Sequence, residues 1–380
     1  MRMTMRERRM KRRRIKMTVL AGLLMFASSF AFKLIINYMS FDDSPVLQSS
    51  KEQSVPDSAG QPQLDPKETQ NSAAGEPSLE RLSSRQESAA DFPLYITVYD
   101  HDAQVKRVML LDEYVYHCLS GEVPASYHDE ALKAQAVAIR TYAVSKMGAY
   151  GGSGCSKSSG ADVCTDSSHC QTFARDEDLK KQWGDDYNFY SQKMKAAVAE
   201  TSGLVALHEG KPILAMFHAN SGGITEDVEA IYSDALPYLR SVDGFDPLSE
   251  STFSFTAKEA AGIINSAYPD AKVKERDLDE QLIVKSRLAS GRVESVICGE
   301  IQLTGTQLRR LFSLPSSNLI IRYPGGDVEF TTYGRGHGVG LSQEGAQEMA
   351  KAGHSYEEIL GHYYQGVTID RLPLSYGSVN

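Results

Sequence analysis

The pattern of hydrophobic and polar positions divides the chain into an apolar segment near its start, a long polar stretch and a body of mixed periodicity. Residues 17–38 are mostly apolar, with Lys33 as their only charged residue. At roughly 1.5 Å per residue they can span about 30 Å of hydrocarbon, and Lys33 is close enough to the end to reach the interface. The basic residues in 1–16 place that segment in the cytoplasm and the rest of the chain outside. We therefore predict a single-pass membrane anchor over 17–38, with a signal peptide cleaved after Ala31 as the alternative.

The polar stretch over residues 39–92 is the second feature of the pattern. Residues 42–91 are rich in Ser, Gln, Pro, Glu and Asp and contain no aromatic residue. Such a composition cannot bury enough apolar surface to fold. It predicts a disordered linker, whose root-mean-square span of roughly 40 Å would let the following domain work away from the bilayer.

The body over residues 93–373 shows both strand and helix periodicities. Residues 92–99 alternate aromatic and β-branched side chains, and with 105–111 they predict an opening pair of strands. A helix follows to about residue 147, with Ser126 or Asp129 as its N-cap and a Gly/Ser-rich loop after it. Further helices are expected around 190–201, 342–352 and 356–364, and further strands at 203–208 and 212–218. The pattern indicates an α+β fold, with mixed strands and helices around a substrate cleft.

Charge changes this picture by excluding one class of partner. Residues 1–16 contain nine Arg or Lys and one Glu, so the remaining 364 residues carry 31 basic and 48 acidic side chains. A broadly acidic body lacks the clustered cations that nucleic-acid phosphates require. We therefore expect no nucleic-acid partner.

The first candidate for chemistry is Glu130 in the first turn of the helix predicted before residue 147. Ala134 and Val137 follow it on the same face, and these small residues permit close approach of a bulky partner. A first-turn acid commonly does no more than complement the helix dipole. Since that dipole also stabilises the charged form, a catalytic Glu130 would need burial to raise its pKa again.

The second candidate is a cysteine-rich segment that includes Cys164, His169 and Cys170. Two thiolates and an imidazole are typical Zn²⁺ ligands, and Cys155 or a distant histidine could complete the shell. A Cys164–Cys170 disulfide outside the cell and free thiols in a loop remain open alternatives.

Two glycine-rich segments complete the candidate chemistry. The turn at Ser221, Gly222 and Thr225 follows a strand and exposes backbone N–H groups and hydroxyls suited to sugar groups, although a plain tight turn is equally consistent. The segment at His337 alternates glycines with other residues and leads into a helix. It lacks the Lys-Ser/Thr pair of a phosphate loop, so we interpret it as a tight bend that directs His337 at a site.

Four ordered motifs give the chain a resemblance to the stage II sporulation protein D family, whose domain is shared with amidase enhancers. They are Glu130-Ala131-Leu132-Lys133-Ala134-Gln135-Ala136-Val137-Ala138 with Arg140-Thr141-Tyr142, His169-Cys170-Gln171, Ser221-Gly222-Gly223-Ile224-Thr225-Glu226, and Gly336-His337-Gly338-Val339-Gly340-Leu341-Ser342-Gln343. The resemblance covers residues 93–370 and implies a lytic transglycosylase that cleaves peptide-stripped peptidoglycan during engulfment. It places the catalytic glutamate at Glu130 and zinc ligands at Cys164 and Cys170, although not every member has these cysteines.

The resemblance also implies a setting and further contacts. The partners would be peptidoglycan glycan strands, the amidase stage II sporulation protein P and the membrane protein stage II sporulation protein M, at the mother-cell engulfing membrane. Motif residues expected to contact the glycan are Lys133, Arg140, Ser221, Gly222, Thr225 and His337. The competing functions are a non-enzymatic amidase enhancer and a zinc-stabilised glycan-binding module.

The implied reaction needs only one carboxylate. A hydrolytic glycosidase uses two, one as acid and one as nucleophile or base. A lytic transglycosylase protonates the oxygen leaving C1 of N-acetylmuramic acid, and the C6 hydroxyl of the same sugar then closes onto C1. One glutamate can act first as acid and then as base, and the product is a 1,6-anhydro end.

Overall fold

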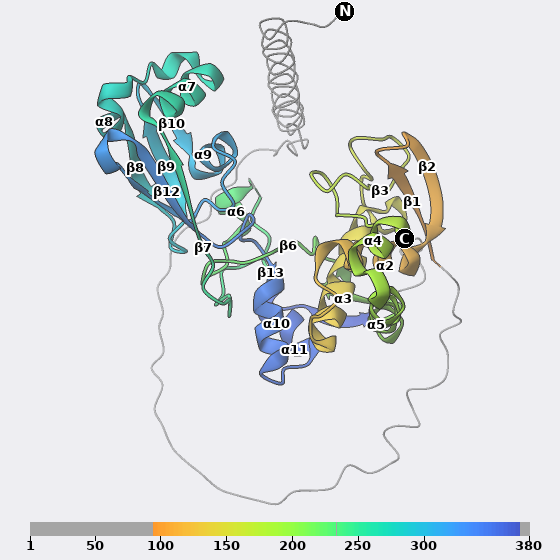
Figure 1. Cartoon of the computed structure of the whole chain (residues 1–380). Helices are drawn as coiled ribbons and strands as arrows, with labels where there is room; N and C mark the ends of the chain where they lie inside the picture. The colour runs from red at the N-terminus through yellow and green to blue at the C-terminus, as the bar shows by residue number, and fades with distance from the viewer. Residues whose placement is uncertain (1–93, 233, 373–380) are drawn as a thin grey trace, which may run out of the picture. The chain divides into compact units, whose positions relative to one another are not determined.

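The computed structural model describes residues 94–232 and 234–372 (Figure 1). The predicted cytoplasmic segment, anchor and linker lie outside these residues. Among the helices that are described, none has the length and apolar character to cross a bilayer. Their bounds are α2 Leu111–Glu122, α3 Asp129–Lys146, α4 Asp176–Trp183, α5 Tyr187–Glu200, α6 Val228–Ile231, α7 Ala257–Ala267, α8 Leu278–Gln281, α9 Gly305–Leu311, α10 Gln343–Lys351 and α11 Tyr356–Tyr363.

The strands form several small sheets, so the predicted α+β class is confirmed. One sheet has the order β2-β1-β3, and β13 and β6 form a parallel pair. The other sheets have the orders β14-β4-β5, β10-β9-β8 and β11-β12-β7. The strand bounds are β1 Tyr95–Asp100, β2 Val105–Leu110, β3 Val163–Cys164, β4 Leu204–His208, β5 Lys211–Pro212, β6 Phe217–His218, β7 Glu250–Phe255, β8 Leu282–Arg287, β9 Val293–Cys298, β10 Ile301–Thr304, β11 Leu319–Arg322, β12 Val328–Tyr333, β13 Leu341–Ser342 and β14 Thr368–Arg371.

The opening hairpin agrees with the predicted pair of strands. β1 and β2 pair antiparallel, and Ile96 and Val98 of β1 point into the core while the alternate residues are more exposed. Helix α2 follows directly after Leu110 and was not predicted. Its sequence contains two Tyr and a Val among its buried residues, and such side chains are as typical of strands as of helices.

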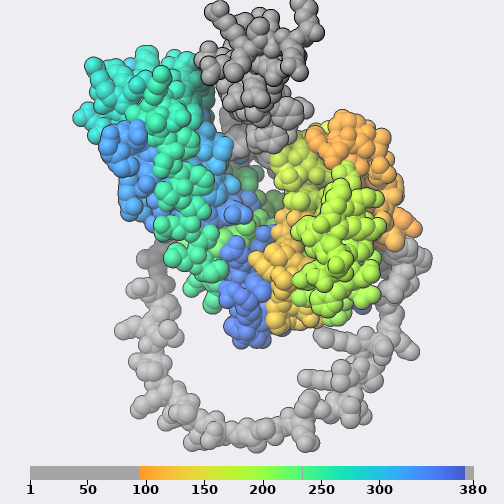
Figure 2. Space-filling view, viewed as in Figure 1, coloured from red at the N-terminus to blue at the C-terminus, as the bar shows by residue number. Residues whose placement is uncertain are grey.

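Helix α3 is the central helix of the first core and is buried on several sides. Ala134, Val137 and Ala138 contribute to a core that also contains Met349 of α10 and Tyr363 of α11. The small side chains of α3 let α10 and α11 approach closely, and the blue surface of the C-terminal helices adjoins the yellow surface of α3 in Figure 2. The run of alanines therefore serves helix packing.

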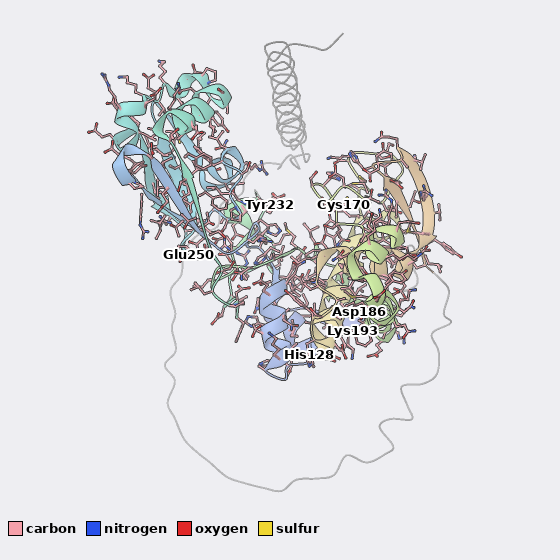
Figure 3. The ribbon with its side chains drawn as sticks, viewed as in Figure 1. His128, Cys170, Asp186, Lys193, Tyr232 and Glu250 are labelled. Carbon is pink, nitrogen blue, oxygen red and sulfur yellow. The ribbon has the colours of Figure 1, made fainter. Side chains whose placement is uncertain are left out.

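The start of α3 corrects one prediction. The N-cap is His128, not Ser126 or Asp129, and its ring Nδ1 accepts a hydrogen bond from the backbone N–H of Glu130 at 3.3 Å. Lys193 of α5 lies near this end of the helix (Figure 3) and donates to the carbonyl of Tyr127. The cap is thus supplied by an imidazole rather than by a hydroxyl or carboxylate.

Residues 250–333, from β7 to β12, have a second core of their own. Phe330, Val296 and Ile264 are fully buried in it, and β7 and β12 pair along six residues and so bring the two ends of this segment together. Helices α7 and α9 each begin with a capping box, at Thr256 and Thr304. We call this segment the inserted lobe.

The C-terminal predictions agree closely with the structure. Helix α10 begins after Ser342, whose hydroxyl accepts from the backbone N–H of Gly345, and α11 follows at Tyr356. The strand predicted at 203–208 is present as β4. Of the strand predicted at 212–218, only Pro212, in β5, and Phe217–His218, which form β6, lie in strands. Residues 213–216, which separate β5 from β6, have no regular structure.

Candidate functional site

A polar cluster centred on Asp246 brings the two glycine-rich motifs together. One carboxylate oxygen of Asp246 accepts from the backbone N–H of Ser221 at 2.9 Å and from the Ser221 hydroxyl, and the other accepts from the Ser342 hydroxyl. Burial raises the pKa of Asp246, while these hydrogen bonds oppose the shift. Ser221 therefore belongs to a polar cluster, in which its hydroxyl is held by a carboxylate that we did not predict from the sequence.

The turn after Ser221 is fixed by close backbone approach. Gly222 has φ +74°, and a Cβ there would lie 2.8 Å from the carbonyl oxygen of Tyr333. The side chain of Asn220 links the turn to α10, because its Oδ1 accepts from the Gly222 N–H and its Nδ2 donates to the carboxylate of Glu344. Thr225 exchanges hydrogen bonds with the backbone of Val242. Gly222 and Thr225 thus shape the loop, and their predicted contacts with glycan stay predictions.

Arg292 of the inserted lobe holds this loop from the other side. Its side chain is fully buried and donates to the carbonyls of Ile224 at 2.9 Å and Ser221 at 2.5 Å. Its neighbour Ser290 donates to the buried carboxylate of Glu226. A Cβ on Gly338 would lie 2.3 Å from the guanidinium carbon, so the glycine-rich segment at residue 338 is packed directly on this cation.

His337 is held by contacts with the backbone. Its Nδ1 accepts from the N–H of Val339 at 3.0 Å, and it also bonds the backbone of Phe217. Burial, with Arg309 and Arg292 nearby, lowers the pKa of His337 to about 4, so the ring is neutral at physiological pH.

His218 is the partner of His337 across the Val339 peptide. Its Nδ1–H donates to the carbonyl of Val339 at 3.1 Å, and the two rings are 5.6 Å apart. In the described structure its Nε2 atom is buried without a hydrogen-bond partner. We did not predict a role for His218 from the sequence, because it is the parallel β6–β13 pairing that brings it beside His337.

Glu122, at the last position of α2, is a second acid that sequence reasoning missed. One of its carboxylate oxygens accepts from the backbone N–H of Thr172 at 2.6 Å, and the other is 3.5 Å from Nε2 of Gln343. Burial raises the pKa of Glu122, although these hydrogen bonds lower it in part. The residue as a whole is half-buried, and its carboxyl has a pKa raised by burial.

Glu130 has a different environment. It pairs with Lys133 at 2.9 Å and accepts from the backbone N–H of Tyr356 at 2.8 Å, which ties α3 to α11. Burial raises its pKa in part, but these hydrogen bonds and the charge of Lys133 outweigh it, so the pKa of Glu130 is lowered. The net rise in pKa that we required for catalysis is therefore not found, and Glu130 as the catalytic acid stays a prediction.

Lys133 and Arg140, the two basic residues expected to contact glycan, have protein partners. Lys133 bridges Glu130 and Glu200. Arg140 is buried, pairs with Asp112 at 2.9 Å and donates to the carbonyls of Val198 and Leu204. Each therefore has a clear structural role, and their glycan contacts remain untested.

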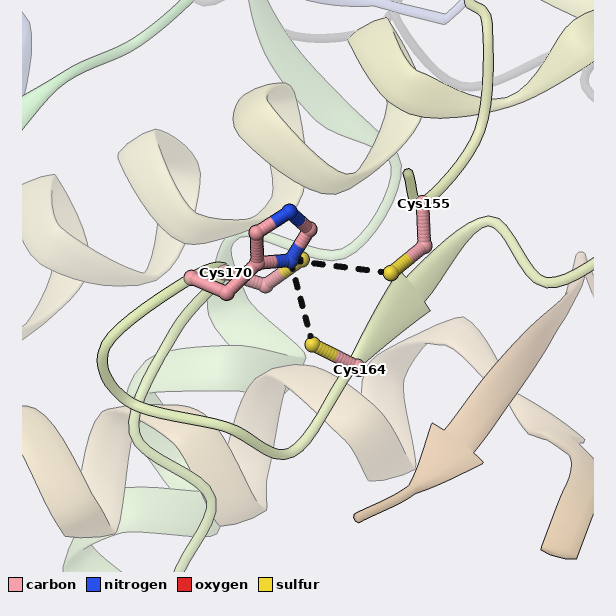
Figure 4. Close-up of side chains that lie close together, drawn as sticks. Cys155, Cys164 and Cys170 are labelled. Carbon is pink, nitrogen blue, oxygen red and sulfur yellow. Dashed lines mark hydrogen bonds between the residues drawn. The ribbon is translucent and has the colours of Figure 1, made fainter. Parts of the chain in front are cut away.

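The cysteine-rich segment forms a compact group of four possible metal ligands. The Nδ1 atom of His169 lies 3.3 Å from the sulfurs of Cys164 and Cys170 and 3.6 Å from that of Cys155 (Figure 4). All four donor atoms lie within 4.8 Å of one another. The cysteines are free, which does not support the disulfide alternative, and Cys155 supplies the fourth position.

These distances fit a tetrahedral ion. With metal–sulfur bonds of about 2.3 Å and metal–nitrogen bonds of about 2.0 Å, tetrahedral ligands lie roughly 3.6 Å apart. The outer nitrogen of His169 lies 2.8 Å from the hydroxyl of Ser156, the second-shell partner that directs Nδ1 inward. The group can therefore hold one metal ion through protein ligands alone.

Comparison of the sequence with known proteins identifies the family of this chain. A family model described as "Stage II sporulation protein" matches residues 99–208, which include Glu122, Glu130 and the four possible metal ligands. Stage II sporulation protein D of Bacillus amyloliquefaciens is 35% identical over 281 residues, covering 73% of this chain and 79% of that protein. The protein of the same name from Bacillus subtilis (strain 168) is 34% identical over the same shares.

A more distant relative has a different name. The amidase enhancer of Bacillus subtilis (strain 168) is 27% identical over 66% of this chain and 39% of that longer protein. The resemblance inferred from the four motifs is confirmed by the two relatives with higher identity. This chain belongs to the stage II sporulation protein D family of sporulation proteins.

Proposed function

We propose that this chain is a peptidoglycan lytic transglycosylase that cleaves peptide-stripped glycan strands, outside the cell, during engulfment in sporulation. The observation that carries the proposal is the carboxyl of Glu122. Its pKa is raised by burial, the residue as a whole is only half-buried, and the carboxyl is positioned by Thr172 and Gln343 from two distant parts of the chain. A general acid needs such a pKa, because it must hold its proton near neutral pH until the leaving group takes it.

The proposed chemistry uses Glu122 twice. Its proton goes to the glycosidic oxygen as the bond from that oxygen to C1 of N-acetylmuramic acid breaks. The resulting carboxylate takes the proton of the C6 hydroxyl of the same sugar as O6 bonds to C1, so the enzyme ends in its starting state. Gln343 Nε2 and the Thr172 N–H are hydrogen-bond donors to the carboxylate formed between these steps.

Zinc is the metal proposed for Cys155, Cys164, His169 and Cys170. Three thiolates and an imidazole suit Zn²⁺, and a site filled by four protein ligands is structural rather than catalytic. When bound, the ion would fix the segment that leads to Thr172, and thereby the donor to Glu122. Family resemblance further suggests the amidase stage II sporulation protein P and stage II sporulation protein M as partners, and a membrane-anchored location.

The test is product analysis on peptide-free glycan with the full-length protein in detergent. Wild-type protein should release 1,6-anhydromuramyl products, and Glu122→Gln should abolish release while leaving the thermal midpoint unchanged. Glu113→Gln, an exposed acid on the same helix, is the matched control and should keep activity. If the wild type releases no such product but accelerates an added amidase, the amidase-enhancer function replaces this proposal.

A further inference from the structure

The loop over residues 243–248 places an exposed aromatic ring beside the Asp246 cluster. Phe245 is 46% exposed, and it precedes the carboxylate that bonds Ser221 and Ser342. Its φ of +56° is in the left-handed region, which is rare for a bulky side chain. Phe245 is the aromatic member of the five non-glycine residues with positive φ in the described structure. Such strain persists only where the surroundings impose it, and it points to a function.

Anchors on both sides impose this conformation. The Gly244 N–H donates to the carbonyl of Gly223 at 2.8 Å, and the Gly244 carbonyl accepts from the hydroxyl of Tyr363. A Cβ on Gly244 would lie 1.9 Å from the Ser221 hydroxyl, so this position has no room for a side chain. On the other side of Phe245, Asp246 is held by its hydrogen bonds to Ser221 and Ser342, so Phe245 is anchored through both neighbours.

The ring of Phe245 is also held in place. It packs edge-to-face against His362 of α11, with ring centroids 5.0 Å apart. The Nε2–H of His362 donates to the carbonyl of Asp243 at 2.7 Å, which fixes the imidazole against the same loop. An exposed aromatic ring that is both strained and braced is pre-organised for contact with a ligand.

Two hydrogen bonds and two pairs of sequence neighbours link Phe245 to the proposed acid. Gln343 Nε2 reaches Glu122, the preceding residue Ser342 bonds Asp246, and Asp246 follows Phe245. A glycan strand presents alternating apolar pyranose faces and polar hydroxyl or acetamido groups. The apolar faces suit the exposed ring of Phe245, which the largely buried Asp246 cluster holds in place from the protein side.

We propose that Phe245 is a sugar-stacking residue that binds the apolar face of an N-acetylhexosamine ring, in a subsite next to the one at Glu122. This inference rests on the proposed function for the identity of the ligand. It assigns Phe245 to substrate binding and not to the chemical step. Its loss should therefore raise KM and leave kcat nearly unchanged.

The experiment measures binding separately from cleavage, using full-length protein with two probes: a soluble β-1,4-linked N-acetylglucosamine hexamer and insoluble peptide-free glycan. Phe245→Ala and Phe245→Gly should each weaken binding about tenfold, the effect of removing one ring face from contact. Phe245→Trp should bind as well as wild type. Leu248→Ala, which removes an aliphatic side chain that is 85% exposed on the same loop, is the control and should not change affinity.

Thermal unfolding separates a binding role from a structural one. Glycine adopts a positive φ without strain, so Phe245→Gly should have a thermal midpoint equal to or above that of wild type while its affinity falls. Equal affinity of wild type, Phe245→Ala and Phe245→Gly, or a wild type that binds neither probe, would overturn the inference. A wild type that binds glycan through Phe245 but yields no 1,6-anhydro product would refute the proposed function alone.

Discussion

Replacing Arg292 tests whether the inserted lobe supports the site. In Arg292→Met the carbonyls of Ser221 and Ile224 lose their donors inside the protein, and Glu226 loses a nearby cation. An unsatisfied buried carbonyl costs about 1–3 kcal/mol, and removing one partner from a buried charge network costs about 3–5 kcal/mol. The Nε atom of Arg292 is buried without a partner among the described residues, so the native cation is itself incompletely satisfied. We therefore expect Arg292→Met to lower the free energy of unfolding by about 3 kcal/mol, near the lower end of the range for a buried charge network.

Urea unfolding of Arg292→Met and of a matched control measures this loss. Arg322→Met removes an exposed arginine of the same lobe whose contact with Glu329 is 4.0 Å long, and such surface changes stay within about 0.5 kcal/mol. Arg292→Lys should lie between the two, because one ammonium cannot reproduce the fork that reaches both carbonyls. If Arg292→Met and Arg322→Met lose equal stability within about 1 kcal/mol, Arg292 does not support the loop as described.

Three further predictions concern the glycine-rich segment, the metal and Glu130. Gly338→Ala should lower the thermal midpoint, because its Cβ would strike Arg292 at a φ of +86°; an unchanged midpoint would contradict this packing. Elemental analysis should find about one zinc per chain, lost in Cys155→Ser and Cys170→Ser but kept in Cys298→Ser, and a metal-free wild type would remove the zinc proposal. Because the folded pKa of Glu130 is lowered, its contacts stabilise the protein above the unfolded pKa and lose this effect as pH falls through the folded pKa. Glu130→Gln should therefore cost roughly 1 kcal/mol in urea at pH 7 and little at pH 3, and an equal cost at both would show that charge is not involved.

Local patterns were sufficient for much of the fold. The opening hairpin, α3, α10 and α11 follow from period-2 and period-3.6 patterns and from capping residues such as Ser342. Helix α2 was missed because its buried tyrosines and valine carry no clear helical signal. The inserted lobe was missed because its short strands form two separate sheets, and the sequence does not show which strands pair.

The site was harder to predict than the fold because its members are distant in sequence. Glu122 is 50 residues from Thr172 and 221 residues from Gln343, so no local spacing marks it. The sequence indicated the cysteine cluster and offered Cys155 or a distant histidine as its fourth member, but it did not indicate Asp246 or Arg292 as partners of Ser221. The sequence suggested a catalytic role for Glu130. It could not show that the pKa of Glu130 is lowered, because that depends on contacts with Lys133 and Tyr356 in the folded protein.

The central claim is tested most directly by comparing Glu122→Gln with Glu130→Gln for release of 1,6-anhydromuramyl products from peptide-free glycan. We predict that Glu122→Gln lowers the rate at least about 100-fold, the usual contribution of a positioned general acid, and that Glu130→Gln stays within about tenfold of wild type. The wild-type rate should also fall as pH rises through the raised pKa of Glu122, because the acid must be protonated. An inactive Glu130→Gln with wild-type stability, beside an active Glu122→Gln, would contradict the account and return the catalytic role to Glu130.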